Sequence, residues 1–248
     1  MGHARRFLLP ALAVFLGVLA AVRYLSQLTL LLLQKPDLWL LDWNVYYVGA
    51  LQLLRRELYR VPLSEVGVSL PVDVFNYPPL AAVWAVPLLP LGREPGGLAF
   101  VLLSIGFVVV GLVLSARALD IQPVWLWVPA VLCAYALLWK ELIVHVGLGN
   151  DNDLVFVLVA GFAAAHLGGF QRTAGILLAL AIATKIWPVA LLVLIVRERR
   201  LIELRWAAAL LAAQSVAFLI WLGPDVVPDA LRAVVLNAPR DLIGQPVI

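Results

Sequence analysis

The sequence lacks most of the residues from which soluble enzymes build their sites. Only 13% of its 248 residues are charged, and it holds one cysteine and three histidines. The lone Cys133 excludes an intramolecular disulfide and a zinc site made of cysteine pairs. The chain also has neither a glycine-rich phosphate loop ending in Lys-Ser/Thr nor a Gly-x-Ser-x-Gly motif. The common signatures of nucleotide-binding and serine hydrolase chemistry are therefore absent.

Charge also argues against a nucleic-acid partner. The net charge of +3 comes from 18 Lys+Arg against 15 Asp+Glu, and these residues are dispersed along the chain. Nucleic-acid-binding domains instead gather their basic residues into a stripe or patch. We therefore expect no nucleic acid among the partners.

What the chain has in abundance is apolar sequence. Hydrophobic residues make up 64% of it, against ~45–50% in an average globular domain, and the mean hydropathy is +1.00. The apolar runs are long and unbroken, whereas the strands of a membrane barrel alternate in polarity. We expect an all-α, multi-pass bundle of transmembrane helices in the cell membrane, forming one integral domain over residues 1–248.

A helix needs ~20 apolar residues to cross the hydrocarbon core. The chain offers five strong candidate spans, at residues 7–33, 98–116, 124–139, 154–167 and 206–222. Arg5 and Arg6 precede the first span, which lacks a small-x-small cleavage site. The positive-inside rule then predicts an uncleaved span with a cytoplasmic N-terminus.

Two further apolar segments leave two topologies open. Residues 77–91 are short and contain four prolines, and residues 174–196 are interrupted by Lys185 and Pro188. In the first topology both segments cross the membrane. In the second, 77–91 stays at the outer surface and 174–196 forms two short helices that meet outside near Lys185. The prolines favour the second topology, because each removes a backbone donor that lipid cannot replace.

Residues 34–97 are predicted to form an extracytoplasmic loop with an amphipathic helix and a proline-rich segment. The helix follows the aromatic stretch at 42–47, and its residues recur at helical spacing. Its expected apolar face consists of Val48, Leu51, Leu54 and Leu58, and its expected polar face of Gln52, Arg55, Arg56 and Glu57.

Asp42 is the first candidate for chemistry. It lies among Trp43, Tyr46 and other aromatic residues just beyond the first span, where a carboxylate can take a proton and the rings can stack on a sugar. The alternative is an interfacial aromatic belt with an incidental acid. Tyr77 opens a Tyr-Pro-Pro-Leu stretch whose prolines favour a structural role.

A second polar group, at residues 145–153, separates two apolar runs. It contains His145, Asn150, Asp151 and Asp153, and such polarity is costly unless it lines a cavity or binds something. The two aspartates suit a divalent cation as oxygen ligands, although helix capping explains at least one of these residues.

Lys185 is the third candidate, because a lysine costs about 3 kcal/mol at a bilayer centre. It suits a phosphate clamp, and snorkelling to the surface is the alternative. His166 is expected merely to pack between helices, and the arginines at 197–205 to anchor the chain in the cytoplasm.

The order of these motifs resembles the GT-C superfold, most closely glycosyltransferase family 87, whose members use sugars carried on polyprenyl phosphate. The similarity covers roughly residues 7 to 221. It rests on Asp42-Trp43-Asn44-Val45-Tyr46-Tyr47, Tyr77-Pro78-Pro79-Leu80, His145 with Gly149-Asn150-Asp151-Asn152, and Ala183-Thr184-Lys185-Ile186-Trp187-Pro188.

By this resemblance the chain transfers a hexose, mannose by expectation, to a lipid or glycan acceptor on the extracytoplasmic side, with inversion. Asp42 would be the general base, and the second topology would hold. No cofactor is implied, and a divalent cation at Asp151 and Asp153 is the alternative. The implied donor-binding residues are Lys185, His145 and Tyr77, and the implied substrate-binding residues are Trp43, Tyr46, Asn150 and Asp151.

The chain departs from the family pattern in two ways. It has Gly149-Asn150-Asp151 where the family usually has Gly-Gln, and it looks shorter, without a C-terminal set of spans. A second membrane subunit is therefore an expected partner, beside the lipid donor, membrane lipid and the acceptor. The alternative function is a non-catalytic membrane protein, either a lipid-carrier translocase or one subunit of a split transferase.

Overall fold

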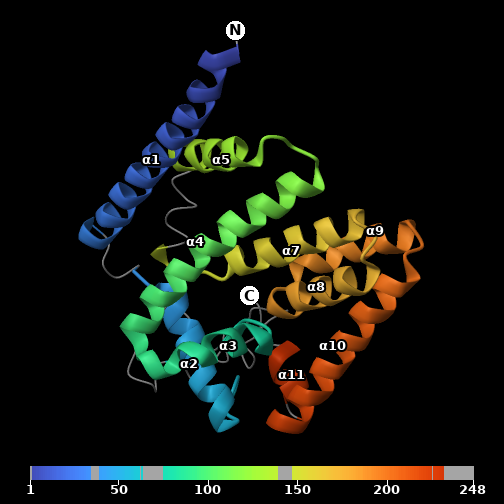
Figure 1. Ribbon diagram of the computed structural model, residues 1–248. Helices are drawn as coiled ribbons and strands as arrows, with labels where there is room; N and C mark the ends of the chain where they lie inside the picture. Colours follow the sequence, from blue (N-terminus) through green and yellow to red (C-terminus); the bar gives the residue numbers. More distant parts are fainter. Residues whose placement is uncertain are drawn as a thin grey trace, which may run out of the picture.

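The computed structural model describes residues 2–34, 39–61, 63, 75–138, 147–224 and 226–231, and these residues form helices joined by turns, with no strand among them. The predicted all-α class is confirmed (Figure 1). The first helices are α1 (Gly2–Gln34), α2 (Leu41–Arg55), α3 (Pro79–Ala85), η3 (Val86–Leu91), α4 (Arg93–Ala118) and α5 (Val124–Leu138). The later ones are α7 (Asn152–Leu167), α8 (Gln171–Thr184), η4 (Trp187–Leu191), α9 (Leu192–Arg197), α10 (Leu201–Leu222) and α11 (Val226–Ala230).

Three of the described helices are long and apolar enough to cross a membrane. They are the parts of α1, α4 and α10 at Leu8–Thr29, Arg93–Ala118 and Leu201–Leu222. Two of the five predicted spans fall on α5 and α7, which have 15 and 16 residues, and α5 ends where the described residues end, so their crossing stays a prediction. At a rise of ~1.5 Å per residue, each is shorter than the hydrocarbon core of ~30 Å. Polar turns at Gly149–Asp151 and Gly168–Gly169 limit α7.

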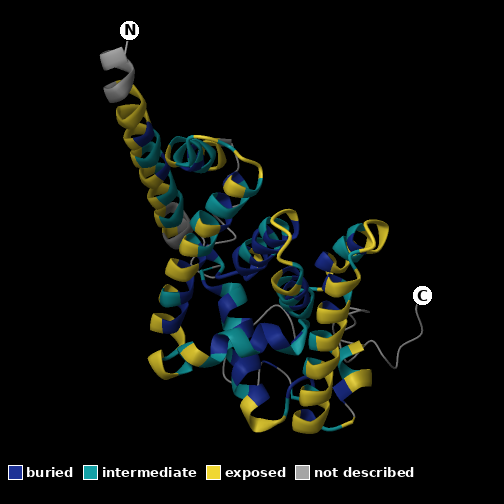
Figure 2. Cartoon of the chain, turned by 45° about the vertical axis from the view of Figure 1, so that its right-hand side comes forward, coloured by how far each residue is buried: buried dark blue, intermediate teal, exposed yellow. Residues whose placement is uncertain are grey.

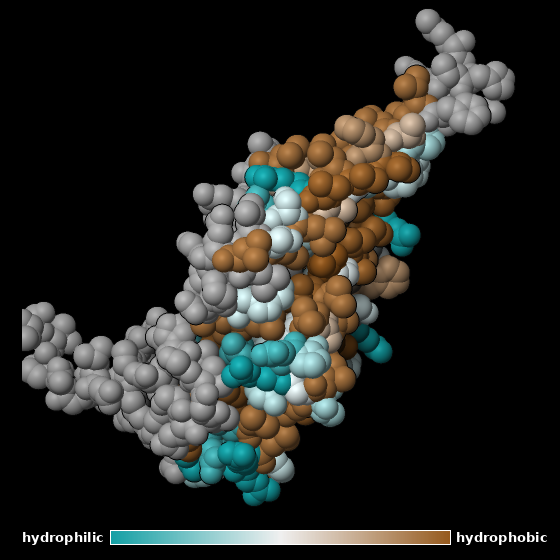
Figure 3. All heavy atoms as spheres, turned by 90° about the vertical axis from the view of Figure 1, so that its left-hand side faces the viewer, coloured by the Kyte–Doolittle hydropathy of each residue, from teal (hydrophilic) through white to brown (hydrophobic). Residues whose placement is uncertain are grey.

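The helices pack in a sequence from one side of the molecule to the other. α1 packs on α5, α4 packs on α7, α7 packs on α8, and α8 packs on α10. Figure 1 shows α1 and α10 on opposite sides, with α7 and α8 between α4 and α10. The outer sides of α1 and α10 are largely exposed (Figure 2), and a broad hydrophobic band covers the face on which α1 lies (Figure 3). Exposed apolar helices of this kind are expected at a lipid surface.

The largest apolar core surrounds α2. Which residues of α2 are buried differs from the predicted apolar and polar faces. The helix begins at Leu41, so the aromatic stretch at 42–47 lies inside it rather than before it. Gln52, expected on the polar face, is 2% exposed and donates to the carbonyl of Val61, whereas Leu54, expected on the apolar face, is 52% exposed. The hydrogen bond removes the cost of burying the Gln52 amide nitrogen, which a hydrophobicity count cannot foresee.

The chain reverses direction at Lys185. α8 ends at Thr184, Lys185 has an extended backbone with φ −140° and ψ 141°, and η4 begins two residues later with Pro188 in its first turn. Ile195 of α9 then shares an apolar cluster with Leu178 of α8 and Phe162 of α7. The segment 174–196 is therefore a pair of short helices rather than one continuous helix. The break is the one that the second topology requires.

The far ends of α7 and α9 are joined by a buried ionisable cluster. His166 Nδ1 lies 2.7 Å from Oε2 of Glu203, which is fully buried, and His166 Nε2 lies 3.1 Å from Oε2 of Glu198. His166 was expected only to pack between helices, but it links the end of α7 to the start of α10. A buried carboxylate needs such a partner, since an unpaired buried charge is strongly destabilising. This cluster fixes the end of the helix pair opposite to Lys185.

Candidate functional site

Backbone hydrogen bonds bring the two polar motifs together. The first N–H groups of a helix have no partner within the helix, and Leu40, the residue before α2, offers no side-chain cap. The N–H groups of Asp42 and Trp43 donate instead to the carbonyl of Leu148, at 2.9 and 3.1 Å, and that of Leu40 donates to Gly147. The start of α2 is thus capped by the turn that precedes α7. Asp42 lies beside Asn150 as a result.

The Asn150 side chain joins Asp42 to Lys185. Its Nδ2 donates to Asp42 Oδ2 at 2.6 Å, and its Oδ1 accepts from Lys185 Nζ at 3.1 Å. The same Oδ1 accepts from the backbone N–H of Asn152, which fixes the orientation of the amide. A carboxylate and an ammonium therefore face opposite ends of one buried amide. Residues separated by more than 140 positions in the sequence meet at this point.

Lys185 has an acceptor for each of its three N–H groups. Besides Asn150, these are Asp151 Oδ1 at 2.8 Å and Asn152 Oδ1 at 2.6 Å. An ammonium has three donors and no acceptor, so its hydrogen-bonding capacity is filled. The acceptors differ in access, because Asn150 and Asp151 are buried while Asn152 is exposed. Asn152 is the one that a ligand can displace most easily.

Two tyrosines form one wall of the site. The Tyr46 hydroxyl donates to Asp151 Oδ1 at 2.9 Å, the Tyr46 and Tyr77 rings lie 4.9 Å apart, and Lys185 Nζ lies 5.5 Å from the centre of the Tyr77 ring. Burial, and then the Asp42 charge, raise the pKa of Tyr77 to about 12. Burial raises the pKa of Asp151 above its usual value, and the Lys185 charge opposes this. Both tyrosines are hydrogen-bond donors at neutral pH.

The other residues predicted for the site are Trp43, Asp153 and His145. Trp43 is fully buried, stacks on Phe100 and donates to the carbonyl of Arg93 at 2.7 Å, so its ring supports α2. Its contact with a substrate stays a prediction. Asp153, in the first turn of α7, is 5% exposed, and burial with the Asp151 charge raises its pKa to about 7. His145 lies outside the described residues.

The structure adds residues that the motifs did not single out. Asn152 binds Lys185 directly, and its only signal in the sequence was its place in the polar turn. Thr184 accepts a hydrogen bond from Trp84 Nε1 at 2.9 Å, which attaches the end of α8 to α3. Nothing in the sequence pairs these two. Among the described residues, no group of three or more His, Cys, Asp or Glu side chains is arranged to hold a metal ion.

Comparison with known proteins identifies the family of the chain. The model of glycosyltransferase family 87 matches residues 75–244, which include Asn150 and Lys185. This match covers more than half of the chain and shows that it is a membrane glycosyltransferase. The chain belongs to glycosyltransferase family 87.

Two curated mannosyltransferases are distant relatives of the chain. The chain is 28% identical over 232 residues to the polyprenol-phosphate-mannose-dependent alpha-(1-2)-phosphatidylinositol mannoside mannosyltransferase of Mycobacterium tuberculosis, and 29% identical over 229 residues to that of Mycolicibacterium smegmatis. Each alignment covers 82% of this chain, but 52% and 51% of the relatives. The chain thus spans about half the length of the curated relatives it matches. No solved structure matches the chain.

Gly149 permits the close approach of the two motifs, and its replacement tests this. It has φ +70°, and a Cβ at this position would lie 2.6 Å from Trp43 Cβ. Gly169 has φ +77°, but a Cβ there meets nothing within 4 Å. A left-handed backbone costs an alanine ~1–2 kcal/mol at either position. We expect Gly149→Ala to lower the melting temperature of the solubilised protein clearly more than Gly169→Ala does. Equal losses would show that α2 and the 147–150 turn are not in contact.

Proposed function

We propose that this chain carries the catalytic site of an inverting transferase, which moves a mannosyl group from polyprenyl phosphate to a lipid or glycan acceptor. The relatives' names supply the donor class, and their acceptor is a phosphatidylinositol mannoside. The reaction is placed on the extracytoplasmic side of the cell membrane, where the second topology puts Asp42 and Lys185. The observation that carries the proposal is the Asn150 amide, which joins the Asp42 carboxylate to the Lys185 ammonium.

Asp42 is the proposed general base. Its Oδ2 is bound to Asn150, and no hydrogen bond to a described residue engages its Oδ1. In the proposed step this carboxylate takes the proton of the acceptor hydroxyl, and the acceptor oxygen forms a bond to C1 of the mannosyl group. The bond between C1 and the phosphate oxygen breaks on the opposite face, so the configuration inverts. The electron pair leaves with the polyprenyl phosphate.

Lys185 is proposed to stabilise the leaving phosphate. The phosphate gains one negative charge as the C1–O bond breaks, and a fixed cation favours this charge more in the transition state than in the ground state. The three acceptors around Lys185 hold the ammonium in place before the donor arrives. The donor phosphate would take the place of the exposed Asn152 amide. Asp151 and Tyr46 would keep the lysine oriented.

No cofactor enters the proposed reaction. Phosphate is a competent leaving group, and Lys185 supplies the positive charge that a metal ion would otherwise provide. A divalent cation at Asp151 and Asp153 would have to bind beside this ammonium, 2.8 Å from Asp151 Oδ1, and the two cations would repel each other. A further membrane-spanning partner is proposed to contribute to the acceptor site.

The Asp42→Asn variant tests the general base. Asparagine keeps an oxygen for the Asn150 bond but cannot take a proton, and general-base catalysis contributes ~10²–10⁴-fold. We expect kcat for mannosyl transfer to fall by about that factor in membranes given radiolabelled polyprenyl phosphate mannose, with the KM for the donor little changed. Glu57→Gln is the control, since it removes a carboxylate just beyond α2. Transfer at the wild-type rate in Asp42→Asn would remove Asp42 as the base.

The displacement of Asn152 is tested by comparing two matched variants. Asn152→Ala removes a competitor for Lys185, so we expect the KM for the donor to fall roughly fivefold at unchanged kcat, which corresponds to about 1 kcal/mol for one hydrogen bond. Asn150→Ala removes the bridge, so kcat falls instead. Both parameters follow from initial rates at varied donor concentration. A higher donor KM in Asn152→Ala would show that Asn152 binds the donor rather than competing with it.

A further inference from the structure

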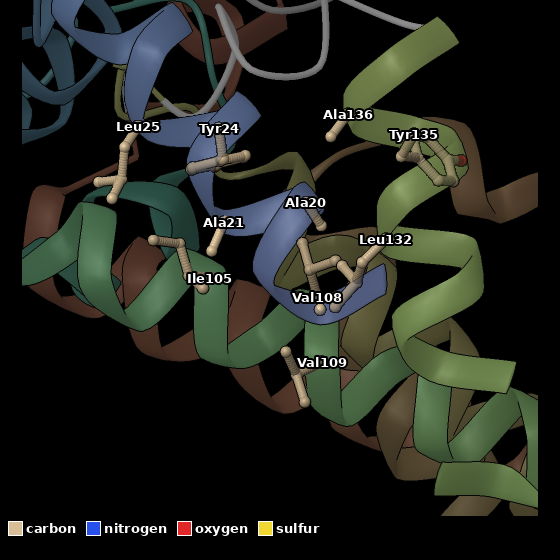
Figure 4. Close-up of a pocket in the computed structure, with 11 residues that line it drawn as sticks. Ala20, Ala21, Tyr24, Leu25, Ile105, Val108, Val109, Leu132, Tyr135 and Ala136 are labelled. Atoms are coloured by element: carbon tan, nitrogen blue, oxygen red, sulfur yellow. The ribbon is translucent and has the colours of Figure 1, made fainter. Parts of the chain in front are cut away.

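A shallow cavity lies where the turn between α7 and α8 meets the first turn of α10. It holds about 380 Å³ and is open to the surface. One arginine lines it together with glycine, polar and apolar residues: Gly169, Phe170, Gln171, Arg172, Thr173 and Ile202. A second cavity, of about 310 Å³ between α1, α4 and α5, is lined by glycine, aliphatic and tyrosine residues (Figure 4). Of these two cavities, the one at Arg172 offers a charged side chain to a ligand.

The cavity at Arg172 lies far from the site at Lys185. α8 begins at Gln171, in the cavity lining, and ends at Thr184, next to Lys185. Its 14 residues span roughly 20 Å at the usual rise of an α-helix. A ligand in this cavity is therefore separate from the groups that are proposed to react at Lys185.

An aromatic ring, rather than a carboxylate, holds Arg172 in place. The Arg172 guanidinium lies 6.0 Å from the centre of the Trp206 ring of α10, and the face of such a ring attracts a cation. Gly175 lets the two helices approach here, because a Cβ at this position would lie 2.9 Å from Trp206 Cβ. Among the described residues, no carboxylate forms an ion pair with Arg172. Its charge and its N–H groups are therefore available to an anion.

Positive charge is in excess beside the cavity. The segment from the end of α9 to the first turns of α10 carries four further arginines: Arg197, Arg199, Arg200 and Arg205. Arg205 lies one helical turn after Ile202, so it shares the face of α10 that lines the cavity. The acids of this segment are engaged, since Glu203 is fully buried against His166, and Glu198 contacts His166 and Arg200. An anion is the ligand that fits this surface.

The cavity also lies at the end of a candidate membrane span. Leu201–Leu222 of α10 is long and apolar enough to cross a membrane, and Ile202 belongs to its first turn. Trp206 follows one turn later, and tryptophans are enriched where helices enter the headgroup layer. Phe170 and Ile202, 69% and 47% exposed, present apolar surface beside Arg172. A phospholipid offers a phosphate to the guanidinium and acyl chains to this apolar surface, whereas a soluble anion offers only the charge.

We propose that this cavity binds the headgroup phosphate of an anionic phospholipid, with Arg172 as its main contact. A planar guanidinium can donate to two phosphate oxygens at once. Gln171 and Thr173 supply further hydrogen-bond donors from the same lining. The bound lipid joins the turn before α8 to α10, so it stabilises the packing of these helices. The inference is independent of the transferase reaction.

Native mass spectrometry of the whole purified chain tests the proposal. The chain is titrated with phosphatidylglycerol and, separately, with phosphatidylcholine that has the same acyl chains. We expect phosphatidylglycerol to bind more tightly, and Arg172→Gln to lower that affinity about tenfold, as for the loss of one charge-assisted hydrogen bond. Arg117→Gln is the matched control, because Arg117 is also exposed and lies in the last turn of α4, another candidate span. It should bind phosphatidylglycerol as the wild type does.

A second variant distinguishes a defined site from the general attraction of a basic surface. Thr173→Phe fills the cavity without changing the charge, so we expect it to lose phosphatidylglycerol binding as Arg172→Gln does. Unchanged binding in Thr173→Phe, or equal affinities in Arg172→Gln and Arg117→Gln, would refute the proposal. Competition by glycerol phosphate at the concentration of the lipid would assign the cavity to a soluble anion and overturn it.

Melting temperatures give a readout that does not depend on the gas phase. Phosphatidylglycerol should raise the melting temperature of the wild type and of Arg117→Gln, because a ligand of the folded state stabilises it. It should not raise that of Arg172→Gln or Thr173→Phe, each measured against its own lipid-free value. An equal rise in all four proteins would contradict the assignment of the cavity.

Discussion

The site depends on one buried amide and the constraint it imposes on two charges. Asn150 can satisfy Asp42 and Lys185 together only because its nitrogen donates to the carboxylate while its oxygen accepts from the ammonium. In a direct ion pair the ammonium would occupy the carboxylate and lower its affinity for a proton. With the amide between them, the carboxylate and the cation stay apart yet share one small volume. This separation is what a reaction with a proton acceptor and a phosphate leaving group requires.

The surrounding fold serves to keep this amide in place. α2 is capped by the turn at 147–148, Gly149 lets the turn approach Trp43, and the chain reverses at Lys185 so that its ammonium meets the turn. At the other end of the helices, His166 ties α7 to Glu203 of α10. The site therefore lies where three segments meet, namely α2, the turn at 147–150 and the chain reversal at Lys185, and hydrogen bonds hold these segments in addition to apolar packing. The exposed sides of α1 and α10 are left for lipid or for other protein.

The sequence predicted those features that depend on local chemistry. The helix break at Lys185 follows from Pro188, and the grouping of Asp42, Asn150 and Lys185 followed from the family resemblance. Other tertiary contacts, which neither a motif nor the resemblance indicated, were missed. Gln52 is buried because Val61 accepts its hydrogen bond, and Glu203 is buried because His166 is its partner. Apolar composition alone does not set the length of a helix, and α5 and α7 have only 15 and 16 described residues, so their crossing of the membrane stays a prediction.

The most direct test of the central claim is a cross-linking measurement between residues 42 and 185 in the membrane. In a Cys133→Ala background, the pair Asp42→Cys and Lys185→Cys is treated with a short bifunctional thiol reagent, beside the pair Asp42→Cys and Arg197→Cys. Residues 185 and 197 lie at opposite ends of the η4–α9 segment. The account predicts efficient linkage within one chain for 42 with 185 and little for 42 with 197. Preferential linkage of 42 with 197 would contradict it.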